Sequence, residues 1–362
     1  MIHRNLILHT EASHGWGGQE IRILTESSAL IRRGFDVRLL ADPQSTIFQR
    51  AASYSVPTIS LRLKKKRILE LFSMIRALST LRPVIVVTHS STDHWIVAIA
   101  RFFLKVKPTV IRLRHISTPV SDNLATRWLY RSATDYIVTT SSLIRDRLLS
   151  SSHATDGKIV SIPTGIDLNF YKPSDKQIAR MQLGISRDTF VFGTIATFRS
   201  WKGHEDLLNA YASLANSESL LVLAGTGPQE DNLKSLTKAL GIADNVLFLG
   251  HLDDPRPCLD LMDCFVFPSY ANEGVPQAIL QAMAYDVTII GSDLPGVLEA
   301  VEGYAHFIKV PARNTKALAN AMNGVLGIPA HGKNANAEIR VRISVDTMAN
   351  HMAKLYEEFI GR

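Results

Sequence analysis

The stretch NLILHTEASHGWGGQEIRILTESSALIRRG, residues 5–34, contains the repeating unit of the fold in one piece. Residues 5–10 are mostly aliphatic, as in a buried strand. Gly17 and Gly18 follow, and apolar residues then recur at helical spacing until Gly34, which is typical of a helix C-terminus. The stretch therefore predicts a strand, a glycine turn and a helix.

The same pattern recurs along the chain and restarts after IPTGIDLNFYKPS, residues 162–174. Strands that alternate with helices form a mostly parallel sheet with helices on both faces. We predict an α/β protein with two Rossmann-like, doubly wound domains, residues 1–172 and 173–345, facing each other across a cleft. We expect an amphipathic helix, residues 346–362, to pack back toward the N-terminal domain.

The composition suits a cytoplasmic protein of two domains. The chain has 362 residues, of which 46% are apolar, enough for two cores. The first residues lack a secretory pattern, and Arg101 interrupts the longest apolar stretch, WIVAIARFFLKV, so we expect no membrane span. Cys258 and Cys264 form no ligand pattern and predict buried free thiols.

The net charge of +7 is distributed unevenly. Residues 1–172 hold 24 Lys and Arg against 12 Asp and Glu, a net charge of +12, and the remaining residues carry −5. A basic half of this kind is typical of proteins that face nucleic acid or an anionic membrane, and charge alone does not choose between them.

Several loops that follow predicted strands carry groups suited to a phosphorylated ligand. In RSWKGHEDLL, Arg199 and Lys202 lie three positions apart before a helix, where two cations match a diphosphate. Solvated loop charges are the alternative. Gly17, Gly18 and Gly227 lie in glycine turns that let backbone approach a ligand closely, although each is also compatible with an ordinary turn.

The stretch EGVPQAILQAMA, residues 273–284, places a carboxylate before a helix start. Pro276 favours the first helical position, and Gln281 follows about two turns after Glu273. A routine helix start and a solvated amide would explain both residues equally well.

The ordered set of motifs resembles the retaining glycosyltransferases of family 4, which have the GT-B fold. It comprises the early glycine pair, IPTGID with Phe170 after it, RSWKG, GTGPQ, FLG, FPSYANEGVPQAILQAMA and SDLPGVLE, and it covers nearly the whole chain. Similar RLRHIS, RSWKGH and EGVPQA stretches occur in a bacterial envelope-polysaccharide subgroup of that family.

The resemblance implies roles for the residues of this last stretch. Glu273 would contact hydroxyls of the donor sugar, and the backbone N–H groups that follow, at Gly274, Val275 and the helix start, would meet the donor. Proline has no N–H, so at Pro276 only the shape of the turn contributes.

Two positions depart from the family pattern. The family usually has a second glutamate, which binds the nucleotide ribose, where this chain has Gln281. An amide can still accept from a ribose hydroxyl, but without the strength of a charged acceptor. Asp286 replaces a common glycine and implies a different turn.

The resemblance also assigns His115, at the end of TVIRLRH, to the neighbourhood of the transferred sugar. His89 and His94, in THSSTDHW, are the alternatives, as acceptor-side or structural residues. None of these spacings is typical of a metal site, and Asp253-Asp254 is too local a signal for one. We therefore expect no metal and no cofactor, with Arg199 and Lys202 supplying the positive charge.

These observations together predict a metal-independent transferase. It would move a sugar from a nucleotide diphosphate sugar, with UDP as the expected nucleotide, to a hydroxyl of a glycan or lipid-linked acceptor with retention of configuration, in envelope polysaccharide or lipopolysaccharide synthesis. A sugar-nucleotide epimerase of the same architecture and a catalytically silent nucleotide-sugar-binding protein remain the alternatives. Nucleic-acid binding is not expected.

The stretch LRLKKKRILELFSMIRAL, residues 61–78, predicts contact with a membrane surface. Lys64, Lys65, Lys66 and Arg67 precede an amphipathic helix, and RFFLKVK, residues 101–107, is a second basic and aromatic stretch. A solvated basic loop before a core-facing helix is the alternative. We expect a peripheral protein at the inner face of the cytoplasmic membrane.

Overall fold

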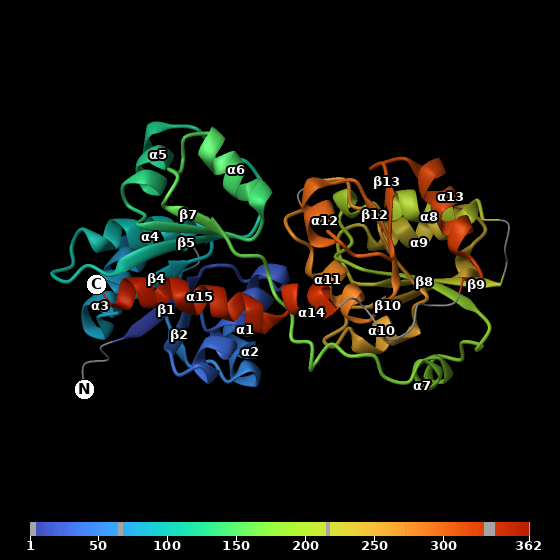
Figure 1. Cartoon of the computed structure of the whole chain (residues 1–362), viewed down its shortest axis with the longest axis horizontal. Helices are drawn as coiled ribbons and strands as arrows, with labels where there is room; N and C mark the ends of the chain where they lie inside the picture. Colours follow the sequence, from blue (N-terminus) through green and yellow to red (C-terminus); the bar gives the residue numbers. More distant parts are fainter. Residues whose placement is uncertain (1–4, 64–67, 215–217, 272, 329–336, 362) are drawn as a thin grey trace. The chain divides into compact units, whose positions relative to one another are not determined.

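A computed structural model of the chain describes residues 5–63, 68–214, 218–271, 273–328 and 337–361. The chain forms two compact units (Figure 1). Residues 1–165 and 343–362 make up the N-terminal unit, and residues 166–342 make up the C-terminal unit.

The N-terminal unit is built on a parallel sheet with the strand order β3-β2-β1-β4-β5-β6-β7. Its elements are β1 (Leu6–Glu11), α1 (Gly18–Arg32), β2 (Asp36–Ala41), α2 (Thr46–Arg50), η1 (Ala51–Tyr54), β3 (Thr58–Ser60), α3 (Ile68–Leu81), β4 (Ile85–Thr88), α4 (Ser91–Arg101), β5 (Thr109–Arg114), α5 (Leu124–Arg131), β6 (Tyr136–Thr139), α6 (Ser142–Ser150), β7 (Ile159–Ser161) and α15 (Val345–Ile360).

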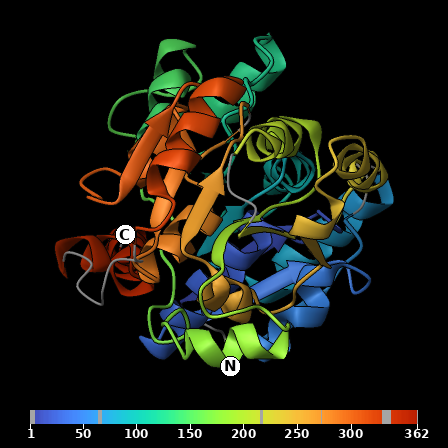
Figure 2. The same ribbon diagram turned by 90° about the vertical axis from the view of Figure 1, so that its right-hand side faces the viewer.

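The C-terminal unit repeats the design with the parallel strand order β10-β9-β8-β11-β12-β13. Figure 2 shows α8 and α9, in yellow-green and olive, nearly end on beside its strands. The elements are α7 (Lys176–Gln182), β8 (Phe190–Ile195), η2 (Ser200–Lys202), α8 (His204–Ala212), β9 (Ser219–Ala224), α9 (Glu230–Ala239), η3 (Ala243–Asn245), β10 (Val246–Gly250), α10 (Arg256–Leu261), β11 (Cys264–Phe267), α11 (Gln277–Ala284), β12 (Thr288–Ser292), α12 (Pro295–Ala300), β13 (Phe307–Val310), α13 (Thr315–Val325) and α14 (Ala337–Arg342).

The strand order reverses direction once in each sheet, between β1 and β4 and between β8 and β11. Loops leave the two strands on opposite sides at such a point, which opens a crevice at the carboxyl ends where ligands of this fold class bind. The two Rossmann-like sheets confirm the predicted fold class. The loops after these four strands and their neighbours are therefore the expected place for a ligand site.

Helix α15 belongs to the N-terminal unit although it ends the chain. It runs beside α1 (Figure 1) and buries Met348, Met352 and Tyr356 against the apolar residues of the N-terminal sheet. The helix therefore completes the core of the unit in which the chain starts.

The unit boundaries lie a few residues before the predicted limits of 172 and 345. Gly165 still belongs to the N-terminal unit, since its N–H donates to Met348 Sδ over 3.2 Å. Phe170 and Tyr171 belong to the C-terminal unit, where the Phe170 ring lies 3.8 Å from the Arg256 guanidinium. The segment after Gly165 is thus held by side chains of the second unit.

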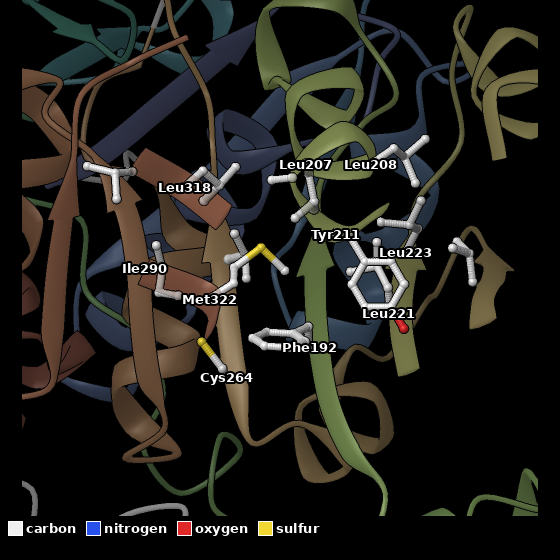
Figure 3. Packing of buried hydrophobic residues seen from close by; sticks show 14 of the residues in the cluster. Phe192, Leu207, Leu208, Tyr211, Leu221, Leu223, Cys264, Ile290, Leu318 and Met322 are labelled. Carbon is white, nitrogen blue, oxygen red and sulfur yellow. The ribbon is translucent and has the colours of Figure 1, made fainter. Parts of the chain in front are cut away.

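The C-terminal unit has an apolar core between its sheet and α8, α9 and α13. Figure 3 shows Phe192 on β8 at the centre of this cluster, among Leu221, Cys264, Ile290 and Met322. Cys264 and Cys258 are both buried free thiols, as predicted. In the part of the chain that the structure describes, no helix is long and apolar enough to cross a membrane.

Replacing Phe192 by alanine should lower the free energy of unfolding by about 3–5 kcal/mol, because a fully buried ring leaves a cavity that its neighbours cannot fill. Urea unfolding of both proteins measures the loss. Ile178→Ala is the control, since that side chain is 52% exposed on α7 and its removal should cost less than about 1 kcal/mol. Equal losses would contradict this account of the core.

Candidate functional site

The loops after β8 and β11 bring Lys202 and Glu273 together. The Lys202 ammonium lies 2.6 Å from Glu273 Oε1, and the two side chains are 19% and 8% exposed. The ammonium also lies 5.3 Å from the centre of the Phe267 ring. The sequence placed both residues at strand ends but did not predict their ion pair.

Gly203 explains why the two loops meet. Its φ is +71°, and a Cβ at this position would lie 2.2 Å from the carbonyl oxygen of Pro268, so only glycine fits. The N–H of Tyr270 donates to the carbonyl of Trp201 over 2.9 Å, which joins the same loops by backbone. Lys202 is therefore fixed beside the segment that leads to Glu273.

Arg199 lies at the start of the same turn, directly before η2. Its guanidinium lies 5.3 Å from the centre of the Trp201 ring. Gly227, from the loop after β9, packs against this region, because a Cβ on Gly227 would lie 2.6 Å from the carbonyl oxygen of Phe198. The predicted residues Arg199, Lys202, Glu273 and Gly227 thus come from loops at one edge of the sheet.

The segment Gly274-Val275-Pro276 leads from Glu273 into α11. Gly274 contacts the first turn of α12, since a Cβ on Gly296 would lie 2.1 Å from the Gly274 carbonyl oxygen. Helix α11 begins at Gln277, and Pro276 precedes it in an extended conformation. The prediction that Pro276 is the first helical residue was wrong by one position, because its ψ of 122° is not helical.

Gln281 is buried on α11, with 5% of its surface exposed. Its amide N–H donates to the Tyr171 hydroxyl over 2.9 Å. Asp286, after the same helix, has a φ of +56°, in the left-handed region where the family glycine fits easily and aspartate is tolerated. Both departures from the family pattern thus have local structural consequences.

His204, the first residue of α8, was not predicted as a site residue. It is 2% exposed, it stacks edge-on against Phe198, and neither ring nitrogen has a recorded hydrogen-bond partner. Burial, and then the charge of Lys202, lowers its pKa to about 4. The signal in the sequence was its position directly after the Lys202-Gly203 turn.

In the N-terminal unit, Gly17 and Gly18 lie at the start of α1, where Gly17 precedes the helix and Gly18 is its first residue. Glu11, at the end of β1, is fully buried near this turn, and its carboxylate accepts a hydrogen bond from the Gln19 side chain. Burial, followed by the nearby Asp93, raises the pKa of Glu11 to about 8. An acidic residue that closes an apolar strand was the sequence signal for this group, and it was missed.

Three histidines form a chain across β1, β4 and β5. His9 Nδ1 lies 2.9 Å from His89 Nε2, and His89 Nδ1 lies 3.0 Å from His115 Nε2. The neighbouring rings have centroids 5.1 and 5.2 Å apart. Burial lowers the pKa of all three imidazoles well below the ordinary value, and nearby arginines act in the same direction.

Asp93 holds the loop that carries His89. Its carboxylate accepts from the His89 N–H over 2.9 Å and from the Thr10 hydroxyl over 2.7 Å, and it forms a capping box with Ser90 at the start of α4. His94, the other histidine of this stretch, is buried, and its Nε2 lies 2.8 Å from the Thr134 hydroxyl. His94 therefore has a structural contact with Thr134, apart from the chain of imidazoles formed by His9, His89 and His115.

The basic cluster Lys64, Lys65, Lys66 and Arg67 lies outside the described residues. Helix α3, which follows it, exposes Ile68, Leu69 and Phe72, each with more than 60% of its surface accessible. The second basic stretch exposes Phe102, Phe103 and Val106 to a similar extent. Large apolar side chains next to positive charge are typical of surfaces that contact lipid.

Asp253 and Asp254, set aside above as a metal motif, have different neighbours. Asp253 Oδ1 lies 3.5 Å from His251 Nε2, and the Asp254 carboxylate accepts three charge-assisted hydrogen bonds from the Arg256 guanidinium, the shortest over 2.6 Å. Within the described ranges, no three or more His, Cys, Asp or Glu side chains are grouped so as to hold a metal ion.

Comparison with known families matches both units. Residues 16–170 match the family described as Glycosyltransferase Family 4, and residues 175–341 match Glycosyl transferases group 1. The fold and these matches define the chain as a GT-B glycosyltransferase. Its C-terminal unit is of the group 1 type and its N-terminal unit is of the family 4 type.

Related sequences are distant. The N-acetyl-alpha-D-glucosaminyl L-malate synthase of Bacillus anthracis is 31% identical over 138 residues, which cover 38% of this chain and 36% of that protein. The lipopolysaccharide core biosynthesis mannosyltransferase LpcC of Rhizobium leguminosarum is 26% identical over 69% of this chain and 75% of its own. The chain thus spans little more than a third of the first of these relatives.

Solved structures share the fold over the full chain. Anabaena HepE, in a crystal structure with UDP and glucose, matches with a TM-score of 0.87 at 19% identity, over 98% of this chain and 100% of its own. A glycosyltransferase from Rickettsia africae also gives a TM-score of 0.87, at 16% identity and 99% coverage of both chains. At these identities the likeness concerns the fold.

Acid should destabilise the C-terminal unit through His204. The unfolded chain takes up a proton near pH 6.5, whereas the folded unit excludes it until about pH 4, so stability is lost as the pH falls through this window. Between pH 7 and pH 5 the loss should be about 2 kcal/mol, and it should approach about 3 kcal/mol below pH 4. Urea unfolding at pH 7 and pH 5 measures it, and His204→Leu should make the profile flatter.

Asn209→Ala is the matched control for His204→Leu, because it changes a half-buried residue of the same helix and keeps the histidine. It should retain the wild-type dependence on pH. A His204→Leu protein as acid-sensitive as the wild type would contradict the assignment.

Proposed function

We propose that the chain transfers a sugar from a nucleotide diphosphate sugar, with UDP as the nucleotide, to a hydroxyl of a glycan or lipid-linked acceptor, with retention of configuration. The observation that carries this proposal is the group of Arg199, Lys202 and Glu273 at the point where the second sheet reverses its strand order. Two cations and a carboxylate therefore lie at the edge of the sheet where ligands of this fold class bind.

The two cations suit a diphosphate leaving group. Negative charge grows on the phosphate oxygens as the bond to the sugar breaks, and fixed positive groups stabilise that charge most when water is excluded. Lys202 is largely buried, so its charge is only weakly screened by solvent. In this proposal Arg199 and Lys202 take the place of a divalent ion, and the reaction needs no metal.

Glu273 would accept hydrogen bonds from hydroxyls of the transferred sugar. A carboxylate has several lone pairs, so Oε1 can remain with Lys202 while the other oxygen binds the sugar. Glu273 would then link sugar and diphosphate recognition through its ion pair. Gly274, Val275 and Gly227 leave room for backbone to approach the donor.

Retention would follow from attack on the face that the diphosphate leaves. The acceptor hydroxyl forms the new bond to the anomeric carbon while the bond to the phosphate oxygen breaks. The departing phosphate oxygen takes the acceptor proton, so no protein base is required. His115 would bind an oxygen of the transferred sugar.

The proposed setting is the synthesis of envelope polysaccharide or lipopolysaccharide at the inner face of the cytoplasmic membrane. The mannosyltransferase LpcC, which the chain resembles, is described as a lipopolysaccharide core enzyme. The basic N-terminal half and the exposed apolar side chains of α3 support contact with an anionic surface.

Glu273→Ala should reduce sugar transfer at least about tenfold, or about 1.4 kcal/mol, because it removes a sugar contact and leaves the diphosphate cations in place. Binding of UDP should stay within a few-fold. Transfer is measured with a panel of nucleotide sugars, and UDP binding by calorimetry. Near-normal transfer by the folded variant would exclude the assignment.

Arg199→Met gives the contrasting result, since it should weaken UDP binding and transfer together. Glu302→Ala removes a carboxylate whose side chain is 81% exposed in the same unit and should change neither. EDTA should leave the wild-type rate unchanged. A loss in EDTA that magnesium restores would contradict the metal-free reaction.

Replacing Lys64, Lys65, Lys66 and Arg67 by glutamine should reduce binding to anionic vesicles at least about tenfold, since each basic residue near such a surface contributes about 1 kcal/mol. Vesicle sedimentation over a range of salt concentrations measures the change. UDP binding should be unaffected.

The matched control for this variant changes the same number of charges in the other unit, at Lys234, Lys238, Lys309 and Lys316, all of which are exposed. It should leave vesicle binding unchanged. Equal effects of the two variants would show that net charge, and not the segment before α3, determines binding.

A further inference from the structure

The chain of imidazoles formed by His9, His89 and His115 links a fully buried residue to one that is partly exposed at the carboxyl edge of the sheet. Burial and the nearby arginines lower the pKa of all three, so the rings are neutral at pH 7. A neutral imidazole has one N–H donor and one bare acceptor nitrogen. Each contact between two rings therefore needs a donor from one and a lone pair from the other.

This requirement leaves two arrangements of protons for the whole chain. In the outward arrangement, His9 Nδ1 donates to His89 Nε2 and His89 Nδ1 donates to His115 Nε2, which leaves a proton on His115 Nδ1. In the inward arrangement every proton moves to Nε2, and His115 Nδ1 becomes a bare acceptor. One end of the chain of imidazoles therefore always has an N–H donor, and the other end always has a bare acceptor nitrogen.

The buried end decides between the arrangements. His9 Nε2 is buried and has no recorded hydrogen-bond partner. The inward arrangement would leave an N–H donor at that atom, and orphaned buried N–H groups are rarer in proteins than under-used acceptors. The outward arrangement leaves only a lone pair at His9 Nε2, and it therefore costs less free energy than the inward arrangement.

We propose that His9 and His89 are positioning residues that hold His115 as a neutral Nδ1–H donor. His115 then binds an oxygen that accepts a hydrogen bond, and it cannot act as the base that removes a proton from a substrate hydroxyl. The identity of that oxygen rests on the proposed glycosyl transfer, in which it belongs to the transferred sugar. The acceptor proton must then leave by another route, such as the departing phosphate oxygen.

Asp93 and Thr10 support the geometry that this chain needs. The Asp93 carboxylate accepts from the backbone N–H of His89 and from the hydroxyl of Thr10, the residue next to His9. The backbone of the first two histidines is thereby tied to one carboxylate. The first ring pair is also nearly parallel, with an interplanar angle of 17°.

Nitrogen-15 NMR of the full chain, labelled at histidine and free of ligand, tests the proposal directly. Protonated and bare ring nitrogens have well-separated chemical shifts, so each tautomer is observed without an activity assay. At pH 7, His9, His89 and His115 should each be protonated at Nδ1. Protonation of His115 at Nε2 in the wild type would overturn the proposal.

His9→Leu removes the donor at the buried end and should let His115 populate both tautomers. For the donor sugar, kcat/KM should fall about two- to tenfold while the affinity for free UDP is unchanged, because part of the population loses the His115 N–H that binds the sugar and the nucleotide contacts are kept. His9→Asn places an amide N–H near the position of Nδ1 and should restore the Nδ1–H form of His115.

His94→Leu is the matched control, since His94 is equally buried in the same unit but bonds to Thr134. It should not alter the His115 signals. An unchanged His115 tautomer in His9→Leu would also overturn the proposal. A wild-type protein that transfers no sugar would refute the proposed function, and the NMR result would still decide the tautomer.

Discussion

The ion pair between Lys202 and Glu273 is the contact on which the C-terminal unit's arrangement of charges depends. Separately, each would be a charged side chain on a loop; together, they are two largely buried groups whose desolvation is offset by each other. The pair exists because β8 and β11 are neighbours, although 71 residues separate its members along the chain. Gly203 then allows the backbone contact that keeps the two loops at this distance.

The N-terminal sheet has the same reversal of strand order and uses it for different chemistry. There, β1 and β4 place His9 and His89 side by side as hydrogen-bonded imidazoles. Burial raises the pKa of Glu11 nearby. Burial, followed by the charge of the buried Arg22, which is paired with Glu26, lowers the pKa of His9. Burial is the common cause, because it raises the pKa of carboxyl groups and lowers that of imidazoles. One topology thus supports an ion pair of Lys202 and Glu273 in one unit and a chain of hydrogen-bonded imidazoles in the other.

The strands, the glycine turns and the succession of two sheet domains along the chain could be predicted from the sequence, since apolar periodicity and turn residues are local signals. The pairing of Lys202 with Glu273, and the contact of His9 with His89, could not. These contacts depend on which strands become neighbours and on the exact register of each pair, which no local pattern encodes. His204 and Glu11 were missed for a related reason, because their altered pKa values come from burial by distant segments.

Gln281 shows how burial bears on a residue that a family pattern would assign to a ligand. A carboxylate at this position, 5% exposed, would need a positive partner or a raised pKa to be tolerated. The amide needs neither, and its N–H donates to the Tyr171 hydroxyl, which belongs to the same unit. The amide nitrogen uses one of its two N–H groups for Tyr171, so the other N–H and the carbonyl oxygen can each bond to a ligand hydroxyl without breaking that bond. The replacement of glutamate by glutamine therefore changes how α11 is tied to Tyr171 as well as which group it can offer to a ligand.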